Sequence, residues 1–496
     1  MINMKNIIIV SIVFISILLT VGCSKEKLDL VPKTSIDERF VFDNKDRVVA
    51  QVNGMYAFMK SGAFLGGRFF VYNDVRCENF VPKSSNLVTN FATWNHTAIS
   101  STNEVQNLWA AIYSAVNAIN IFIEGLNTSW TDGKLTGIIT QAEKDQYISE
   151  ALTLRAICYF DLLQMYAKPY NMSSGTNQGV PLRLIAMKSA EGNDLAPSSV
   201  AAVYTQILKD LNDAEPLAIT TYGATADLLN TTRIHKNTII AFKTRVYLHM
   251  QNWASVVTES AKIVPASAPF VASTGVPFAL TSTYAGVFAP PYTTKESIFS
   301  MPMTSTNNPG TQNSLSHYTN PVSSEAYYLI TSAGSTYDKM DATDARKVMM
   351  ITSSGKKYLN KWPDNTNRTD YAPVMRYAEV LLNRAEALVR AGSSVKQEAV
   401  DLLNAVRKRS FSTGGYTLAS FATAADFYTA ILLERSMEFL GEGMRNMDIM
   451  RLSLTIPAKD GGSMGTVAAV APNSSTYIWP ISGNELTFNK LMTPNN

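Results

Sequence analysis

The stretch KNTIIAFKTRVYLHMQNWASVVTESAKIVP, residues 236–265, decides the fold class. Small, apolar and aromatic side chains recur in each half at the three- and four-residue spacing of a helix face, which predicts two short helices. The run HMQN at 249–252 predicts the turn between them, and Pro265 ends the second helix because proline lacks the N–H that a helix needs. The spaced residues are Ala241, Arg245, Tyr247 and Leu248 in the first half, and Trp253, Val256, Val257 and Ala261 in the second.

This helical hairpin resembles a tetratricopeptide repeat, in which small and aromatic residues let two paired helices approach closely. A second candidate hairpin spans residues 371–409, and neither hairpin matches the full repeat consensus. Hairpins of this kind bury their exposed faces only against neighbours. Several degenerate copies stacked into a short solenoid are therefore expected.

The rest of the chain alternates predicted helices with two long stretches that lack helical periodicity. Residues 61–101 and 265–361 are rich in small polar and aromatic residues, which predicts irregular loops that display binding groups. The predicted fold is all-α and mostly helical, with tetratricopeptide-like hairpins and long irregular loops. The further predicted helices lie at 36–56, 105–120, 147–166 and 203–217.

The first 23 residues have the layout of an export signal. Lys5 is followed by an apolar run at 7–19 and then by the small residues that precede Cys23. This pattern resembles the lipobox of bacterial lipoproteins, in which the cut falls before the cysteine and its thiol receives lipid. We expect residues 1–22 to be a signal peptide and Cys23 to carry acyl chains that hold the chain to a membrane. An ordinary secreted protein with an incidental cysteine is the alternative.

Charge and cysteine content narrow the function further. The sequence has 43 Lys+Arg and 40 Asp+Glu, so it lacks the basic surplus that nucleic-acid binding requires. We therefore expect no nucleic-acid partner. Beyond Cys23 only Cys77 and Cys158 are present. Cys158 lies in an apolar helical run and is expected to be a core residue, while a bridge between these two cysteines is left open.

Carboxylates gather in the last third of the chain. Glu379 and Glu386 lie seven residues apart on one helix face, and acids alternate with arginines from Glu434 to Arg451. Paired carboxylates can indicate glycoside hydrolysis. A general acid, however, needs a raised pKa, and the interleaved arginines favour the ionised form. These charges are therefore predicted to be structural and to pair along the helices.

Other sequence patterns that can indicate catalysis or metal binding lack the neighbouring residues that such sites need. The run Gly461–Gly465 satisfies G-x-S-x-G but follows no buried strand, so it is predicted to be a loop. Asp338, Asp341 and Asp344 lack the glycine and distal glutamate of a calcium loop and are predicted to form a solvated turn. No catalytic set, metal site or cofactor is expected. The histidines, which form no metal-ligand pair, are His96, His235, His249 and His317.

Two segments, VMRYAEVLLNRAEA at 374–387 and ERSMEFLGEGMRNMDIMR at 434–451, closely resemble signatures of the SusD/RagB family. The lipobox, the run KESIF at 295–299 and the ending that starts with WPI at 479–481 agree with that family in order. The resemblance implies a SusD-like fold and a non-catalytic, lipid-anchored protein on the outer membrane of Bacteroidetes-type bacteria. It also implies that the protein binds a nutrient and sits on a SusC-like TonB-dependent transporter.

The resemblance further implies an organisation and a set of binding residues. Residues 23–300 form an amino-terminal part with the hairpins, and residues 301–496 form a carboxyl-terminal part packed with it as one lobe. The repeat side is expected to dock the transporter, and the loop side to capture the nutrient, most naturally an oligosaccharide or polysaccharide. A surface glycoside hydrolase and a scaffold that binds only proteins are the alternatives. The expected ligand-binding candidates are Trp94 with Asn95, and then Tyr284, Tyr292 and Tyr318.

Overall fold

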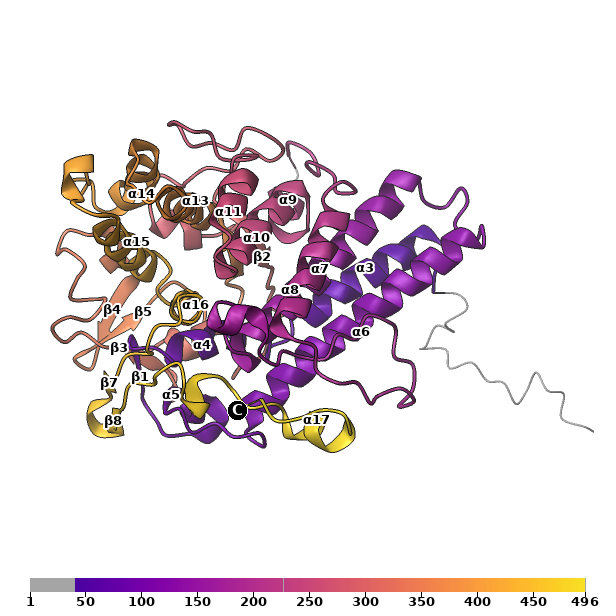
Figure 1. Cartoon of the computed structure of the whole chain (residues 1–496), viewed down its shortest axis with the longest axis horizontal. Coiled ribbons are helices and arrows are strands. Elements are labelled where there is room, and N and C mark those ends of the chain that lie inside the picture. The colour runs from indigo at the N-terminus through magenta and orange to yellow at the C-terminus, as the bar shows by residue number, and fades with distance from the viewer. Residues whose placement is uncertain (1–40, 226, 496) are drawn as a thin grey trace, which may run out of the picture.

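The computed structural model describes residues 41–225 and 227–495 (Figure 1). The predicted signal peptide and Cys23 lie outside these described residues. Most of the regular structure is helical, which confirms the predicted fold class. The α-helices are α3 (Lys45–Met59), α4 (Arg68–Val75), α5 (Phe91–Trp94), α6 (Asn103–Thr131), α7 (Gln141–Tyr166), α8 (Val200–Ala214), α9 (Asp227–Thr232), α10 (Lys236–His249), α11 (Trp253–Ser260), α12 (Leu315–Thr319), α13 (Tyr377–Gly392), α14 (Gln397–Ser410), α15 (Ala424–Glu438), α16 (Met444–Arg451) and α17 (Gly483–Phe488).

The two predicted hairpins are present as α10 with α11 and as α13 with α14. Asn252 caps α11 by accepting a hydrogen bond from the Ser255 N–H, and Gln251 makes the turn with a positive φ of 57°. Although more than a hundred residues separate the hairpins in sequence, α11 packs directly against α13, so that α10, α11, α13 and α14 lie side by side (Figure 1). This is the stacked arrangement that the sequence predicts.

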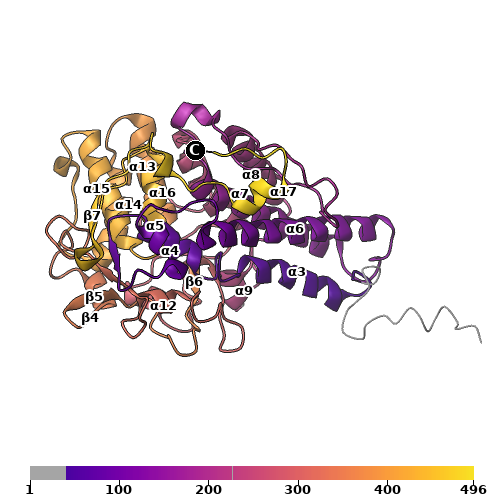
Figure 2. The same ribbon diagram turned by 90° about the horizontal axis from the view of Figure 1, so that it is seen from below.

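Two long helices build the other end of the molecule, where α6 lies between α3 and α7 (Figure 2). The side chain of Thr140 caps α7, and Glu143 bonds back to the Thr140 N–H, which completes a capping box. By length and hydropathy α6 could cross a membrane. Its buried face, which includes Leu108 and Ile112, instead packs into the main core shared with its neighbours.

Within the described residues the strands form four two-stranded antiparallel ribbons. In the longest of them Ser297 pairs with Arg376, which joins the loop-rich segment 265–361 to the residue just before α13. Phe80 pairs with Leu329 in a second ribbon and joins segments far apart in the chain. The pairs are β1 (Phe80–Pro82) with β3 (Tyr327–Leu329), β2 (Ser297–Met301) with β6 (Ala372–Arg376), β4 (Met350–Ser353) with β5 (Lys356–Leu359), and β7 (Lys459–Asp460) with β8 (Thr466–Val467).

Some predicted boundaries are wrong. The first described helix is capped by Asn44 instead of starting at residue 36, and residues 372–376 form a strand ahead of α13. The segment 61–101 is not one irregular loop, because it contains α4, all of whose residues are buried. Some polar groups of α4 are bonded in the interior: the Asn73 side chain donates to the Phe69 carbonyl, and Asp74 Oδ2 accepts from the Gly443 N–H.

Cys77 and Cys158 are both free thiols, so the bridge that the sequence left open is not formed. Both are buried, as expected for Cys158, and they belong to different apolar clusters. Burial raises the pKa of the Cys77 thiol, because the thiolate would have to leave water. Both cysteines therefore act as small core residues.

Candidate functional site

Three of the five predicted binding residues lie in the interior. The exposed fraction is 0% for Trp94, 2% for Tyr284 and 1% for Tyr318. Each polar atom is bound to a backbone carbonyl: Trp94 Nε1 donates to Phe80 at 2.7 Å, Tyr284 Oη to Glu438 at 2.7 Å, and Tyr318 Oη to Gln312 at 2.6 Å. These three rings are packed in the protein interior and present no face to a ligand in this structure.

The other two predicted residues are partly exposed. Asn95 follows the last residue of α5, and Tyr292 lies in the segment ahead of β2. The Tyr292 ring stacks on Tyr371 with ring centroids 5.0 Å apart and planes inclined by 29°, and its hydroxyl donates to Asp370 at 3.0 Å. Of the predicted aromatics, Tyr292 alone brings a ring to the surface, and its ring partner differs from those of Trp94, Tyr284 and Tyr318. The structure therefore does not gather the predicted residues into one site.

A roomy cavity lies elsewhere, along α6, and we call it the α6 groove. Its volume is about 360 Å³, whereas four further cavities in the described part of the chain, at about 10 to 20 Å³, have room for little more than a water molecule. A volume of this size is within the usual range for small-molecule sites. The groove is lined by Trp109, Ala110, Tyr113, Ser114, Val116, Asn117, Asn120, Arg183, Met187, Ser189, Asn193 and Glu485.

One wall of the α6 groove is a stripe of side chains on α6. Trp109, Tyr113, Asn117 and Asn120 follow at intervals of four, four and three residues and so share a helix face. Tyr113 Oη donates to the Pro181 carbonyl at 2.8 Å. Asn117 bonds both the carbonyl and the N–H of Met187, at 3.0 and 2.7 Å. Asn120 donates to the Arg183 carbonyl at 2.9 Å. These bonds hold the segment 181–187 against the helix.

The opposite wall comes from that segment and from α17. Glu485 accepts hydrogen bonds from Trp109 Nε1 at 3.3 Å, Arg183 Nη2 at 3.2 Å and Asn489 Nδ2 at 2.7 Å. The rings of Trp109 and Tyr113 lie 4.9 Å apart at the base. Burial raises the pKa of Tyr113, so its hydroxyl stays protonated. Aromatic rings, amides and one compensated ion pair suit a polar but uncharged ligand.

The sequence does not predict the α6 groove, because Trp109 and Tyr113 have the spacing of ordinary core residues. The available signal was the continuation of that stripe into Asn117 and Asn120, since amides are uncommon on a purely apolar face. The second wall, at 183–193 and Glu485, is too far away in sequence for any local pattern to reveal.

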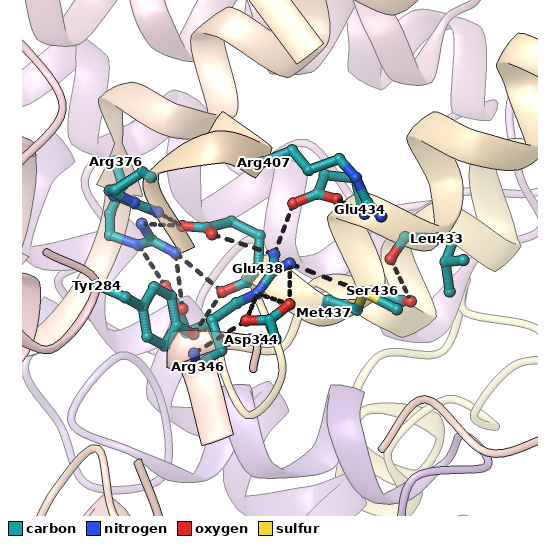
Figure 3. Close-up of polar contacts among 12 residues, drawn as sticks. Tyr284, Asp344, Arg346, Arg376, Arg407, Leu433, Glu434, Ser436, Met437 and Glu438 are labelled. Carbon is teal, nitrogen blue, oxygen red and sulfur yellow. Dashed lines mark hydrogen bonds and ion pairs between the residues drawn. The ribbon is translucent and has the colours of Figure 1, made fainter. Parts of the chain in front are cut away.

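The acids of the last third form a buried charge network with arginines, shown in Figure 3. Glu438 lies 2.9 Å from Arg376 Nη1 and 2.5 Å from Arg409 Nη2, and Glu434 lies 2.6 Å from Arg346 Nη1. We use the name buried charge network for Glu296, Asp344, Arg346, Arg376, Arg407, Arg409, Glu434, Glu438 and Glu442.

Burial by itself raises the pKa of Glu438, but Arg409, Arg376 and Arg346 together bring that pKa well below its ordinary value. An ionised carboxylate enclosed by guanidinium groups cannot serve as a general acid, so these acids give no support to hydrolysis. Most pairs join different elements instead of running along one helix as expected. Glu379 of α13 bonds Arg245 of α10, and Glu386 bonds Arg451 of α16.

The structure also places the remaining residues that were weighed as catalytic or metal-binding. Ser463 of the G-x-S-x-G run lies in a short exposed turn between β7 and β8. Asp344 is not in a solvated turn but is buried against Arg346 at 2.7 Å. Burial lowers the pKa of His96 to about 2 and that of His235 to about 4. Within residues 41–225 and 227–495, no group of His, Cys, Asp and Glu is arranged to hold a metal ion.

Two family models match this sequence. The SusD family model matches residues 295–496, and a model described as starch-binding associating with outer membrane matches residues 27–248. The chain belongs to the SusD/RagB family. The resemblance in the signatures at 374–387 and 434–451 is thereby confirmed. Proteins of this family bind carbohydrates and are generally associated with the outer membrane.

Solved structures of SusD proteins have the same fold. A SusD superfamily protein from Bacteroides fragilis is 29% identical with a TM-score of 0.80, and the match covers 91% of this chain and 100% of that chain. A SusD-like carbohydrate-binding protein from Bacteroides vulgatus is 21% identical with a TM-score of 0.74, covering 91% and 98%. A laminarin-binding SusD-like protein is 19% identical with a TM-score of 0.72, covering 92% and 99%.

A curated relative from Formosa agariphila, also SusD-like, is 26% identical over 267 residues. That match covers 52% of this chain and 46% of the relative. The chain thus spans about half the length of this SusD relative.

Proposed function

We propose that this SusD family protein is a cell-surface lipoprotein that binds a nutrient glycan and delivers it to a SusC-like TonB-dependent transporter in the outer membrane. The supporting observation is that SusD family models match both halves of the chain, over residues 27–248 and 295–496. The fold agrees over almost the whole chain with that of a protein described as laminarin-binding. The ligand we propose is an oligosaccharide or polysaccharide.

The lipid anchor is proposed from the sequence alone, because Cys23 follows the small residues of a lipobox. Acyl chains on Cys23 would keep the folded body beside the transporter. The test is membrane fractionation and fatty-acid labelling of Cys23→Ala in a Bacteroidetes host, with Ser24→Ala as the matched control. We expect Cys23→Ala to lose both label and membrane association and Ser24→Ala to keep both. An unlabelled wild-type protein would contradict the proposal.

Glycan binding is tested by affinity electrophoresis of the full chain in gels that contain starch, laminarin, mannan, xylan or pectin. At least one polysaccharide is expected to retard migration without release of reducing sugar. Release of sugar would favour the surface-hydrolase alternative. No retardation in any gel, together with capture of proteins alone, would favour the scaffold that binds only proteins.

Delivery requires a physical partner. Affinity purification of the wild-type lipoprotein from detergent-solubilised outer membranes is expected to recover a TonB-dependent barrel in near-stoichiometric amount. Recovery without any such barrel would contradict the transporter part of the proposal while leaving glycan binding in place.

A further inference from the structure

We propose that the α6 groove is a binding site for a short, neutral saccharide. This inference rests on the proposed glycan-binding function and assigns it a place and a ligand class. The site differs from every residue that the sequence singled out for ligand binding, since none of those five residues lines the groove.

The groove is preorganised. Asn120, 3% exposed at its base, donates to the segment 181–187 and accepts a bond from Arg155 Nη1 at 2.9 Å. Arg155 is itself held by a bidentate pair with Asp210 of α8, at 2.8 and 2.7 Å. The wall is therefore braced through α6, α7 and α8, and little ordering remains to be done when a ligand enters.

The polar groups at the groove have spare hydrogen-bonding capacity. Arg183 uses Nη2 for the Asn193 carbonyl at 2.9 Å and for Glu485, and within the described part of the chain its Nε and Nη1 have no protein partner. Asn193 donates through Nδ2 to the Phe488 carbonyl, which leaves its Oδ1 as an acceptor. A sugar hydroxyl both donates and accepts, so it can satisfy both kinds of group at once.

The charge of the lining selects a neutral ligand. Among the described residues that line it, Arg183 is the one cation and Glu485 the one anion, and their side chains face each other at 3.2 Å with 11% and 12% exposure. A uronate or sulfate entering the groove would meet Glu485 as well as Arg183, and would gain less than it loses in hydration. The partly exposed ring of Tyr113, backed by the buried ring of Trp109, instead offers an apolar surface for the C–H face of a sugar.

Two lining residues allow the groove to be filled without disturbing the core. Ala110 and Ser114 are exposed and lie one turn apart on α6. A tryptophan at either position would project into the groove from an exposed site. Asn127 is also exposed on α6 but does not line the groove, so Asn127→Trp is the matched control.

The experiment is calorimetric titration of the full chain with neutral trisaccharides of glucose, mannose, galactose and xylose, and with the trisaccharide of galacturonic acid. We expect the wild type to bind at least one neutral trisaccharide and to bind galacturonate more weakly than galactose. Ser114→Trp and Ala110→Trp should each weaken that binding at least tenfold, while Asn127→Trp binds within twofold of wild type. Thermal melts should show all three variants folded.

The possible results distinguish a failure of the α6 groove as the binding site from a failure of the proposed glycan-binding function. Unchanged trisaccharide affinity in both groove-filling variants would overturn the groove as the site and leave the proposed function intact. Polysaccharide retardation without binding of any neutral trisaccharide would do the same. Tighter binding of the acidic trisaccharide would overturn the ligand class. If neither polysaccharide nor trisaccharide bound, the proposed function would fall together with this inference.

Discussion

The buried charge network and the α6 groove both contain arginine and glutamate, but these residues differ in how far they are exposed to solvent. In the network, Glu438 has no exposed surface and contacts Arg376 and Arg409 at 2.9 and 2.5 Å. In the groove, Arg183 and Glu485 are partly exposed and meet at 3.2 Å. In the network the enclosed carboxylates and guanidinium groups pair with one another, whereas partial exposure in the groove leaves donors and acceptors available to a ligand. Burial, more than residue type, separates the structural charges from the candidate binding groups.

The largest expected effect lies in the network. Arg376 contacts Glu296, Glu438 and Glu442 at 2.5, 2.9 and 2.7 Å, so Arg376→Met would leave buried carboxylates without this partner. The free energy of unfolding, measured in urea, should fall by about 3–5 kcal/mol. Lys209→Met, which removes an exposed ion pair with Asp213, is the control and should cause no measurable change. If the two substitutions lowered the free energy of unfolding equally, the difference between buried and exposed ion pairs would be contradicted.

The next largest effect is expected from acid, which should weaken the ion pairs of Glu438 in the network and those of Glu386 and Asp448 outside it. Despite burial, neighbouring arginines lower the pKa of Glu386, Glu438 and Asp448. As pH falls below the ordinary values of about 4.5 and 3.8, the unfolded chain takes up protons before the folded chain does. The stability that these three carboxylates contribute is therefore complete above about pH 5, and below that pH it should fall by about 1.4 kcal/mol per pH unit for each carboxyl. Urea midpoints that stay level from pH 7 to pH 3 would show that these acids are not held ionised.

The ion pair between Arg183 and Glu485 in the α6 groove should contribute less to the free energy of unfolding than the network does. Arg183→Met removes the contact with Glu485 but leaves that carboxylate partly hydrated and still bonded by Asn489. We expect a loss of about 1 kcal/mol in the free energy of unfolding, measured as for Arg376→Met. A loss as large as that of Arg376→Met would mean that the groove pair is a structural element of the same kind.

The smallest effect is expected at Tyr292, where the ring stacks on Tyr371 at the surface. Tyr292→Ala should lower stability by about 0.5 kcal/mol, measured in urea, because one aromatic contact is lost. Tyr292→Phe keeps the ring and removes only the hydrogen bond to Asp370, so it should match wild type more closely. If Tyr292 also contacts glycan, affinity electrophoresis will show weaker retardation for Tyr292→Ala than for Tyr292→Phe.

The helical hairpins could be predicted from the sequence because their evidence is local. Trp253, Val256 and Val257 repeat within a few residues, although the second helix ends at Ser260 and not, as predicted, at Pro265. The burial of α4 could not be predicted in this way, because the N–H that satisfies Asp74 belongs to Gly443, 369 residues further along the chain.

The binding candidates show the same limit of local evidence. Trp94 has polar neighbours in the sequence and Trp109 has apolar ones, yet both are almost fully buried. Only the three-dimensional arrangement shows that Trp94 is enclosed by the core and that Trp109 lies at the base of a cavity. The decisive neighbours, Arg183 and Glu485, come from other parts of the chain.

The pairing of β1 with β3 has a consequence for how such proteins exchange segments during evolution. Phe80 from the first hundred residues completes a ribbon with Leu329, and Ser297 does so with Arg376. A recombinant that inherits one half of the chain from a distant relative would therefore need strand partners that still match in register. Crossovers are expected to survive mainly between close homologues, which keeps both halves evolving together.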